Sequence, residues 1–224
     1  MPLGEVGNTF VGGDDPVFIG YKELEVIRRF TDLSGASIVD IGCGIGRLTR
    51  HLIHENVKDY LGLDIVPEIM QEARAFAAGD PRFRFEIAQD FKIPIADASA
   101  TLVVAFSVIT HMIDEEGFEY IREARRVLKP GGIALFSFLD FMDEVHLEAF
   151  FRHAGEYRLG HGDMLKYTTQ AVLQKFAQRA GFIQTEFISG HAKLKTSGVP
   201  SRLLDVNAIA PTYNMYQSVC AMTA

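Results

Sequence analysis

An acid and three alternating glycines stand at the end of a short apolar run. The segment VDIGCGIGRL, residues 39–48, places Asp40 two residues before Gly42, which is followed by Gly44 and Gly46. Glycine permits both a positive φ and a close approach of a ligand to the backbone. A strand that ends in such a loop and opens a helix gathers backbone N–H groups and a helix N-terminus, so the segment predicts binding of an anionic or polar group.

Spacing distinguishes the ligands that glycine-rich loops hold. A phosphate-binding P-loop needs Lys followed by Ser or Thr after its last glycine, whereas Gly46 is followed by Arg47 and Leu48. The dinucleotide fingerprint Gly-x-Gly-x-x-Gly would need a third glycine where Arg47 stands. Both ligands are therefore disfavoured, and a tight turn without any ligand is the structural alternative.

The elements around this loop alternate between apolar strands and amphipathic helices. Strands are expected at residues 37–41, 59–65, 82–88, 100–107, 131–139, 182–189 and 213–222. Helices are expected at residues 20–30, 46–55, 67–78, 115–128 and 169–181. This alternation predicts a parallel sheet covered on both faces. Because no helix is visible between the last two strands, that pair is expected to be antiparallel.

The pattern acid-x-Gly-x-Gly-x-Gly resembles motif I of class I S-adenosylmethionine-dependent methyltransferases. Further motifs follow in the family's order, namely YLGLDI at 60–65, FEIAQDF at 85–91, ATLVVAFSVITHM at 100–112 and VLKPGGIALFS at 127–137. The resemblance implies an α/β, Rossmann-like methyltransferase fold. Its sheet has seven mostly parallel strands with an antiparallel C-terminal hairpin, and helices cover both faces. S-adenosylmethionine is the implied cofactor, and S-adenosylhomocysteine is the implied product.

The resemblance also implies a role for each matching residue. Asp64 would accept both ribose hydroxyls, through charged hydrogen bonds of about 1.5–3 kcal/mol each. Asp40 would order the loop and meet the aminoacyl end, while Asp90 would accept from the adenine amino group unless it is an ordinary loop cap. The expected cofactor-binding residues are Asp40, Gly42, Cys43, Gly44, Gly46, Asp64, Ile65, Asp90, Phe91, Phe106 and Ser107.

The segments outside the core are expected to recognise the methyl acceptor. We expect a single domain over residues 1–224, with an N-terminal helical lead-in at 1–35 and a cofactor-binding core at 36–139. Acceptor-side insertions are expected at 140–167 and 190–212. The acceptor-side candidates are Tyr21, His153, Tyr157, His161 and Tyr167. For Tyr21, anchoring of the first helix is an equal alternative.

The segment after the fourth strand bears on the acceptor. It contains AFSV at 105–108 rather than a tetrad such as NPPY, which marks many enzymes that act on base amines or glutamine. We therefore expect a small polar metabolite as acceptor, with a hydroxyl oxygen favoured over nitrogen or carbon. His111 is the candidate base, and the alternatives are His146, His153, His161 and His191. The irregular spacing of His and Asp residues predicts no metal site.

Composition limits the remaining classes of function. The 224 residues carry a net charge of −7, which disfavours a nucleic-acid partner. The sequence contains neither a signal-peptide pattern nor an apolar stretch near eighteen residues, so we expect a cytoplasmic protein without a membrane partner. Cys43 and Cys220 are expected to be separate buried thiols. A nucleotide-cofactor oxidoreductase and a non-catalytic S-adenosylmethionine-binding module are the rival functions.

Overall fold

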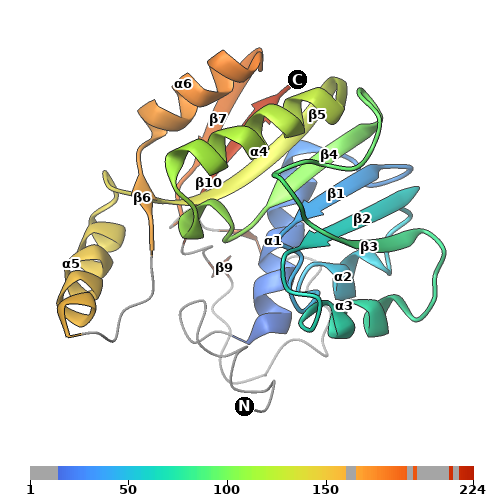
Figure 1. The fold of residues 1–224 in the computed structure, drawn as a ribbon, viewed down its shortest axis with the longest axis horizontal. Coiled ribbons are helices and arrows are strands. Elements are labelled where there is room, and N and C mark those ends of the chain that lie inside the picture. Colours follow the sequence, from blue (N-terminus) through green and yellow to red (C-terminus); the bar gives the residue numbers. More distant parts are fainter. Residues whose placement is uncertain (1–14, 160–164, 191–193, 196–211, 214–216) are drawn as a thin grey trace. The chain divides into compact units, whose positions relative to one another are not determined.

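The described residues fall into two compact units. The computed structural model describes residues 15–159, 165–190, 194–195, 212–213 and 217–224. The first unit comprises residues 1–89 and 191–216, and the second comprises residues 90–190 and 217–224. Figure 1 shows the helices and strands, with labels on elements of both units.

Three parallel strands of the sheet belong to the first unit. Strand β1 (Ser37–Ile41) pairs with β2 (Asp59–Asp64), and β2 pairs with β3 (Phe83–Ile87). Every residue of β1 is buried, as expected for a strand covered on both faces. Because the carboxyl ends of parallel strands share one edge, the loops that follow β1 and β2 are brought together, with Asp40 opposite Gly62 in the register.

Helices α1 (Pro16–Phe30), α2 (Thr49–Leu52) and α3 (Met70–Ala77) accompany this sheet, and α2 packs beside both of the others. Helix α1 starts four residues before the predicted position 20. The sequence contains the signal for this earlier start, because the Asp15 carboxylate accepts the Val17 N–H at 2.8 Å and Pro16 occupies the first turn. Helices α2 and α3 are shorter than predicted. Strands β8 (Leu194–Lys195) and β9 (Thr212–Tyr213) form a separate antiparallel pair.

In the second unit, the main strands lie in the order β4-β5-β10-β7, and the short strand β6 (Tyr167–Thr168) pairs with the end of β5. Strand β4 (Ala100–Ala105) runs parallel to β5 (Leu128–Asp140). Strand β10 (Ser218–Thr223) is antiparallel to both β5 and β7 (Gln184–Ile188), which confirms the predicted antiparallel pair. Strand β5 begins at Leu128, three residues before the expected start at 131, and a register shift between Ala100 and Leu102 of β4 accommodates the extra length.

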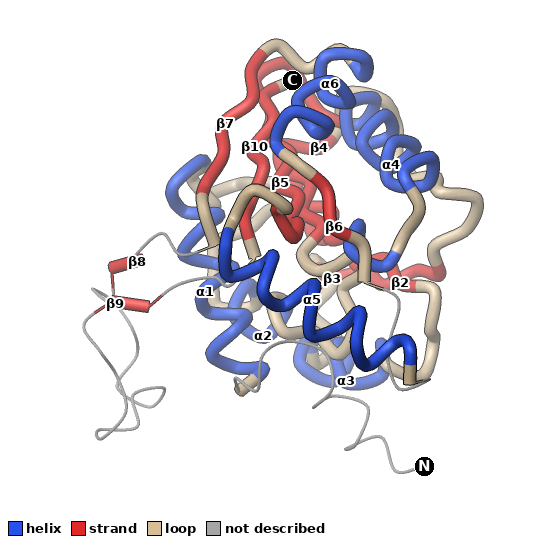
Figure 2. The backbone as a smooth tube through the Cα atoms, turned by 90° about the vertical axis from the view of Figure 1, so that its left-hand side faces the viewer, coloured by secondary structure: helices blue, strands red, loops and turns tan. Residues whose placement is uncertain are grey.

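Two helices of the second unit lie side by side. Figure 2 shows α4 (Asp114–Val127) next to α6 (Gln170–Ala180), and the rings of Phe118 and Phe176 are 5.3 Å apart. The predicted ends of α6 are confirmed: Thr169 caps its start, and Gly181 follows it with a φ of 92°. The short 3-10 helix η1 (Ile109–His111) follows β4.

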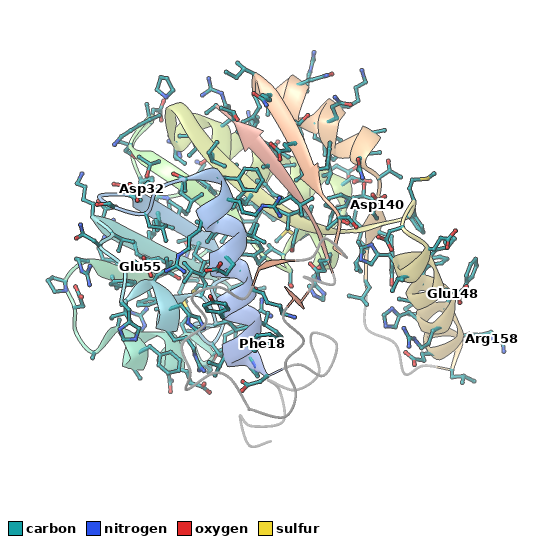
Figure 3. All side chains as sticks on the ribbon, turned by 180° about the vertical axis from the view of Figure 1, so that it is seen from behind. Phe18, Asp32, Glu55, Asp140, Glu148 and Arg158 are labelled. Carbon is teal, nitrogen blue, oxygen red and sulfur yellow. The ribbon has the colours of Figure 1, made fainter. Side chains whose placement is uncertain are left out.

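Helix α5 (Glu144–Arg158) occupies most of the predicted insertion 140–167, where no helix was predicted. The sequence contained its start signal, because the Asp143 carboxylate accepts the N–H groups of Val145 and His146. The buried His146 ring accepts the Asp140 N–H at 2.9 Å, which fastens the helix to the end of β5. Figure 3 shows Asp140 at this junction.

Within the part of the chain that the structure describes, no helix is long and apolar enough to cross a membrane.

Candidate functional site

The loop between β1 and α2 has a backbone that only glycine adopts readily. Gly42, Gly44 and Gly46 have φ values of 70°, 52° and 83°. A Cβ at Gly46 would also lie 2.8 Å from the Cα of Ala73 in α3, so that position lacks room for a side chain. The alternating glycines of the sequence therefore meet conformational requirements of the turn, and one of them also meets a packing requirement.

The N–H groups of this loop are engaged within the protein. Gly42 and Cys43 donate to the Leu63 carbonyl at 2.7 and 3.0 Å, and Gly44 donates to the Asp64 carboxylate. The prediction that the loop gathers free N–H groups at a helix N-terminus is therefore wrong for Gly42, Cys43 and Gly44. Helix α2 has only four residues, and the N–H groups bind the end of β2 instead. The loop still offers a backbone that a ligand can approach without meeting side chains at its glycines.

Asp64 connects the ends of the first two strands. One carboxylate oxygen accepts the Gly44 N–H at 2.9 Å and the other accepts the Val66 N–H at 3.0 Å. A carboxylate oxygen has two lone pairs, so each oxygen keeps capacity for one more donor such as a ribose hydroxyl. The next side chain, Ile65, is 71% exposed and is available as an apolar surface. These features fit the ribose and adenine of S-adenosylmethionine.

Asp40 is buried at the end of β1. Its carboxylate accepts the Tyr60 hydroxyl at 2.7 Å, and the Tyr60 oxygen lies 2.9 Å from the Thr49 hydroxyl. Burial raises the pKa of Asp40 to about 7, although the hydrogen bond from Tyr60 opposes this effect. A buried acid with a neutral donor is an incompletely compensated charge, and a cationic ligand group would stabilise its ionised form.

Sequence reasoning missed Glu23 and underrated Arg47. The charged residues of the first helix were expected to face solvent, opposite its apolar side, yet Lys22 and Glu23 are both buried. Glu23 forms an ion pair with Arg47, the residue after the last loop glycine, at 3.1 Å. Burial raises the pKa of Glu23, and Arg47 counteracts it. No signal in the helical pattern of residues 20–30 distinguished this charge from a solvated one.

The predicted adenine residues lie in the second unit and form a strained turn. Asp90 and Phe91 have φ values of 51° and 55°, which is uncommon for residues other than glycine. Asp90 is exposed, and the Phe91 ring packs edge-on against Tyr120 at 5.5 Å. Such backbone conformations cluster at functional sites, so the turn favours the predicted roles.

The end of β4 carries another left-handed residue. Phe106 is buried and Ser107 has a φ of 61°. The Ser107 N–H donates to the buried Ser137 hydroxyl at 2.7 Å, and that hydroxyl donates to Gln217 at 2.6 Å. Sequence reasoning missed Ser137 and Gln217, which hold this turn from β5 and from the residue before β10.

The predicted base and the acceptor-side residues belong to several elements of the two units. His111 is half-buried at the end of η1. In the second unit, the His153 ring lies 3.1 Å from the Tyr167 hydroxyl, whereas Tyr157 is 69% exposed on α5. In the first unit, Tyr21 is buried edge-on against His51, a position that suits an anchor for α1. His161 lies outside the described residues.

No group of three or more His, Cys, Asp or Glu side chains in the described ranges is arranged to hold a metal ion.

Comparison with known proteins identifies the family of the core. Residues 39–136, from the glycine loop through β5, match the family described as "Methyltransferase domain". The matched residues form a methyltransferase domain. A solved structure of phosphoethanolamine N-methyltransferase 2 from Haemonchus contortus, in complex with S-adenosyl-L-methionine, superposes on 91% of this chain and 52% of its own, with a TM-score of 0.62 and 18% identity. The predicted Rossmann-like methyltransferase fold is thereby confirmed.

Curated relatives share this methyltransferase domain. The 27-O-demethylrifamycin SV methyltransferase of Amycolatopsis mediterranei is 37% identical over 52% of this chain and 43% of its own length. The ubiquinone biosynthesis O-methyltransferase of Nitrosococcus oceani is 29% identical over 75% of this chain and 71% of its own length. The match spans less than half the length of the first of these relatives, so the similarity concerns the domain rather than the whole enzyme.

Proposed function

We propose that this chain transfers the methyl group of S-adenosylmethionine to a hydroxyl oxygen of a small polar metabolite. The observation that carries the proposal is the glycine loop after β1, whose Gly44 N–H is bonded to the Asp64 carboxylate at the end of β2. The name of the ubiquinone biosynthesis relative, an O-methyltransferase, supports oxygen as the acceptor atom.

Residues of the first unit suit the parts of the cofactor. We propose that the aminoacyl end approaches the glycine loop, with its amino group near Asp40. The ribose hydroxyls would donate to the oxygens of Asp64 that already hold Gly44 and Val66. The exposed Ile65 side chain would pack on one adenine face. Burial of apolar surface and charged hydrogen bonds would then both favour binding.

The remaining candidate cofactor-binding residues belong to the second unit. We propose that Asp90 accepts from the adenine amino group while the Phe91 backbone meets the same ring edge. Phe106 and Ser107 would flank the methionine portion. Support comes from the left-handed backbone of Asp90, Phe91 and Ser107, because strained conformations persist where the surroundings require them.

The chemistry follows from a displacement at carbon. When bound, S-adenosylmethionine supplies a methyl group on a positively charged sulfur. The protein must hold the acceptor oxygen in line with the carbon–sulfur bond, so that the carbon–oxygen bond forms as that bond breaks and its electron pair stays on sulfur. The hydroxyl proton must also leave, and we propose His111 as the base that accepts it. The acceptor-side residues proposed from the sequence are Tyr21, His153, Tyr157, His161 and Tyr167.

Calorimetry with S-adenosylmethionine, S-adenosylhomocysteine and NAD tests the cofactor. We expect both sulfur ligands to bind and NAD to give no heat. If NAD bound and neither sulfur ligand did, the proposal would be wrong and the rival function, a nucleotide-cofactor oxidoreductase, would be favoured. Mass spectrometry across hydroxylated and amine metabolites then tests turnover: a product heavier by one methylene unit on an oxygen supports the proposal, a methylated amine or carbon redirects the acceptor, and binding without any product favours a non-catalytic module.

A further inference from the structure

A buried ion pair joins helix α1 to the glycine loop. Glu23 Oε1 lies 3.1 Å from Arg47 Nη2, with the Glu23 side chain almost fully buried and 19% of the Arg47 side chain exposed. The helix and the loop approach so closely that a Cβ at Gly20 would lie 2.0 Å from the Arg47 carbonyl oxygen. The ion pair therefore belongs to the packing of α1 against the loop rather than to the surface.

Arg47 also acts on the acid at the end of β1. Its guanidinium lowers the pKa of Asp40, so it lies within electrostatic reach of that carboxyl group. Asp40 accepts a hydrogen bond from the neutral Tyr60 hydroxyl, whereas the ion pair of Arg47 is with Glu23. A guanidinium has five N–H donors and pairs readily with carboxylates. Glu23 and Asp40 thus compete for one nearby cation.

We propose that Glu23 is a positioning residue for the cofactor: by holding Arg47, it keeps the Asp40 carboxylate open to the cofactor's cationic amino group. This inference rests on the proposed function, because it requires S-adenosylmethionine or its product as the ligand. Without Glu23, the guanidinium would turn to Asp40 and occupy the carboxylate that the amino group needs. Glu23 acts through Arg47 and touches no reacting atom.

The charges around Asp40 determine how this arrangement responds to pH. The titratable groups that act on Asp40 come from α1, the loop and β2, and they are Glu23, Cys43, Arg47, Tyr60 and Asp64. Burial and the negative charge of Glu23 raise the pKa of Asp40, whereas Arg47 lowers it. Glu23 itself faces Arg47 and Lys22. Removing the charge of Glu23 and releasing Arg47 would therefore both lower the pKa of Asp40.

Binding of S-adenosylhomocysteine by purified variants tests the inference. Glu23→Gln should weaken binding by about tenfold at neutral pH, because a charged competitor now occupies Asp40. Adding Arg47→Met should restore the affinity to within about threefold of wild type, since the competitor is gone. The control is Glu25→Gln, which removes a negative charge two positions later on α1, from an ion pair with Arg28. This variant should bind S-adenosylhomocysteine as tightly as wild type.

The pH profile of binding separates positioning from simple destabilisation. Wild-type affinity should rise as the pH increases through about 7, because Asp40 ionises over that range. In Glu23→Gln the rise should move to lower pH, because the pKa of Asp40 falls. A variant that is only less well folded would lose affinity without moving the profile, and thermal unfolding measures that loss separately.

Three results would overturn the inference, namely unchanged binding by Glu23→Gln, a double variant as weak as Glu23→Gln, or an unmoved pH profile. Arg47→Met alone provides an independent test if Glu23→Gln does not fold. Measured well above pH 7, where Asp40 is ionised with or without Arg47, it should bind within about threefold of wild type, and a loss of about tenfold would show that Arg47 itself holds the cofactor. If wild type binds neither sulfur ligand, the proposed function fails before this inference is tested.

Discussion

Tyr60 determines how Asp40 is held at the end of β1. Because the single hydroxyl proton of Tyr60 goes to the carboxylate, the Thr49 hydroxyl must donate to the Tyr60 oxygen. These buried hydroxyl groups hold one oxygen of the Asp40 carboxylate in place. Both are neutral, so neither balances the negative charge of the carboxylate. Asp64 differs, because two backbone N–H groups hold its carboxylate beside an exposed Ile65.

Substitution of Asp64 should affect both cofactor binding and the stability of the loop. Asp64→Ala removes the acceptor for Gly44 and for the proposed ribose hydroxyls, so we expect S-adenosylhomocysteine binding to weaken by at least about tenfold. The melting temperature should fall as well, because the Gly44 and Val66 N–H groups lose their partner. Asp59→Asn, at the opposite end of β2, should leave the affinity unchanged. Calorimetry and thermal unfolding give the two readouts, and unchanged affinity in Asp64→Ala would remove Asp64 from the site.

Sequence patterns identified residues whose role follows from local spacing. The alternating glycines occupy left-handed positions, and the acids predicted to end β1 and β2 lie near the ends of those strands. Glu23 was not found, because its burial depends on which surface α1 packs against, and a single helical pattern does not contain that information. Ser137 was missed for the same reason: its partner Gln217 is 80 residues away in the chain.

At the scale of elements, helix α1 packs so closely on the glycine loop that one of its positions requires glycine. Gly20 occurs where the helix and the Arg47 carbonyl meet, whereas Gly155 of α5 has nothing within 4 Å of its missing Cβ. The two glycines share a helical conformation and differ in their surroundings. The same substitution should therefore have opposite effects at the two positions.

Gly20→Ala should destabilise the protein by about 1–3 kcal/mol, because the new methyl group overlaps the Arg47 carbonyl. Gly155→Ala should stabilise it by about 0.5–1 kcal/mol, since alanine favours an exposed helix over glycine. Denaturant unfolding of the two variants measures both effects. Equal changes in the free energy of unfolding would contradict the close packing of α1 on the loop.

Element boundaries were predictable where caps and turn residues agreed with the pattern. Helix α6 spans Gln170–Ala180, within one residue at each end of the predicted 169–181. The start of α1 was predicted too late and α5 was not predicted at all. In both cases the N-cap residue, Asp15 or Asp143, lies in a glycine-rich or polar segment that was interpreted as a loop. The extension of β5 through Pro130 and Gly131 runs against the usual behaviour of these residues in strands, and the register shift with β4 accommodates it.

At the scale of the whole molecule, the buried Asp40 links stability to pH. Burial raises its pKa to about 7, so between about pH 4 and 7 the folded chain keeps a proton that the unfolded chain loses. The contribution of this group to stability is therefore present at low pH, falls as the pH rises and is constant above the folded pKa. Asp40→Asn cannot ionise, so its stability relative to wild type should increase from about pH 4 to 7 and then level off.

Denaturant unfolding of wild type and Asp40→Asn over this pH range makes the measurement. Tyr60→Phe serves as the control, because the loss of the hydroxyl removes a hydrogen bond that lowers the pKa of Asp40. When both proteins also carry Tyr60→Phe, the stability difference between them should become constant only at a higher pH, because the pKa of Asp40 is higher. A stability difference between wild type and Asp40→Asn that stays constant with pH would show that Asp40 does not titrate in the folded protein.

Each unit contains one cysteine, whose chemical labelling can report when the structure around it opens. Cys43 lies in the first unit and Cys220 in the second, and both thiols are buried with pKa values raised by burial. A thiolate-directed reagent can modify either sulfur only when the surrounding structure opens. Peptide mass mapping of the labelling time course therefore compares opening around the glycine loop with opening around β10, and reports whether the two units open in one cooperative event.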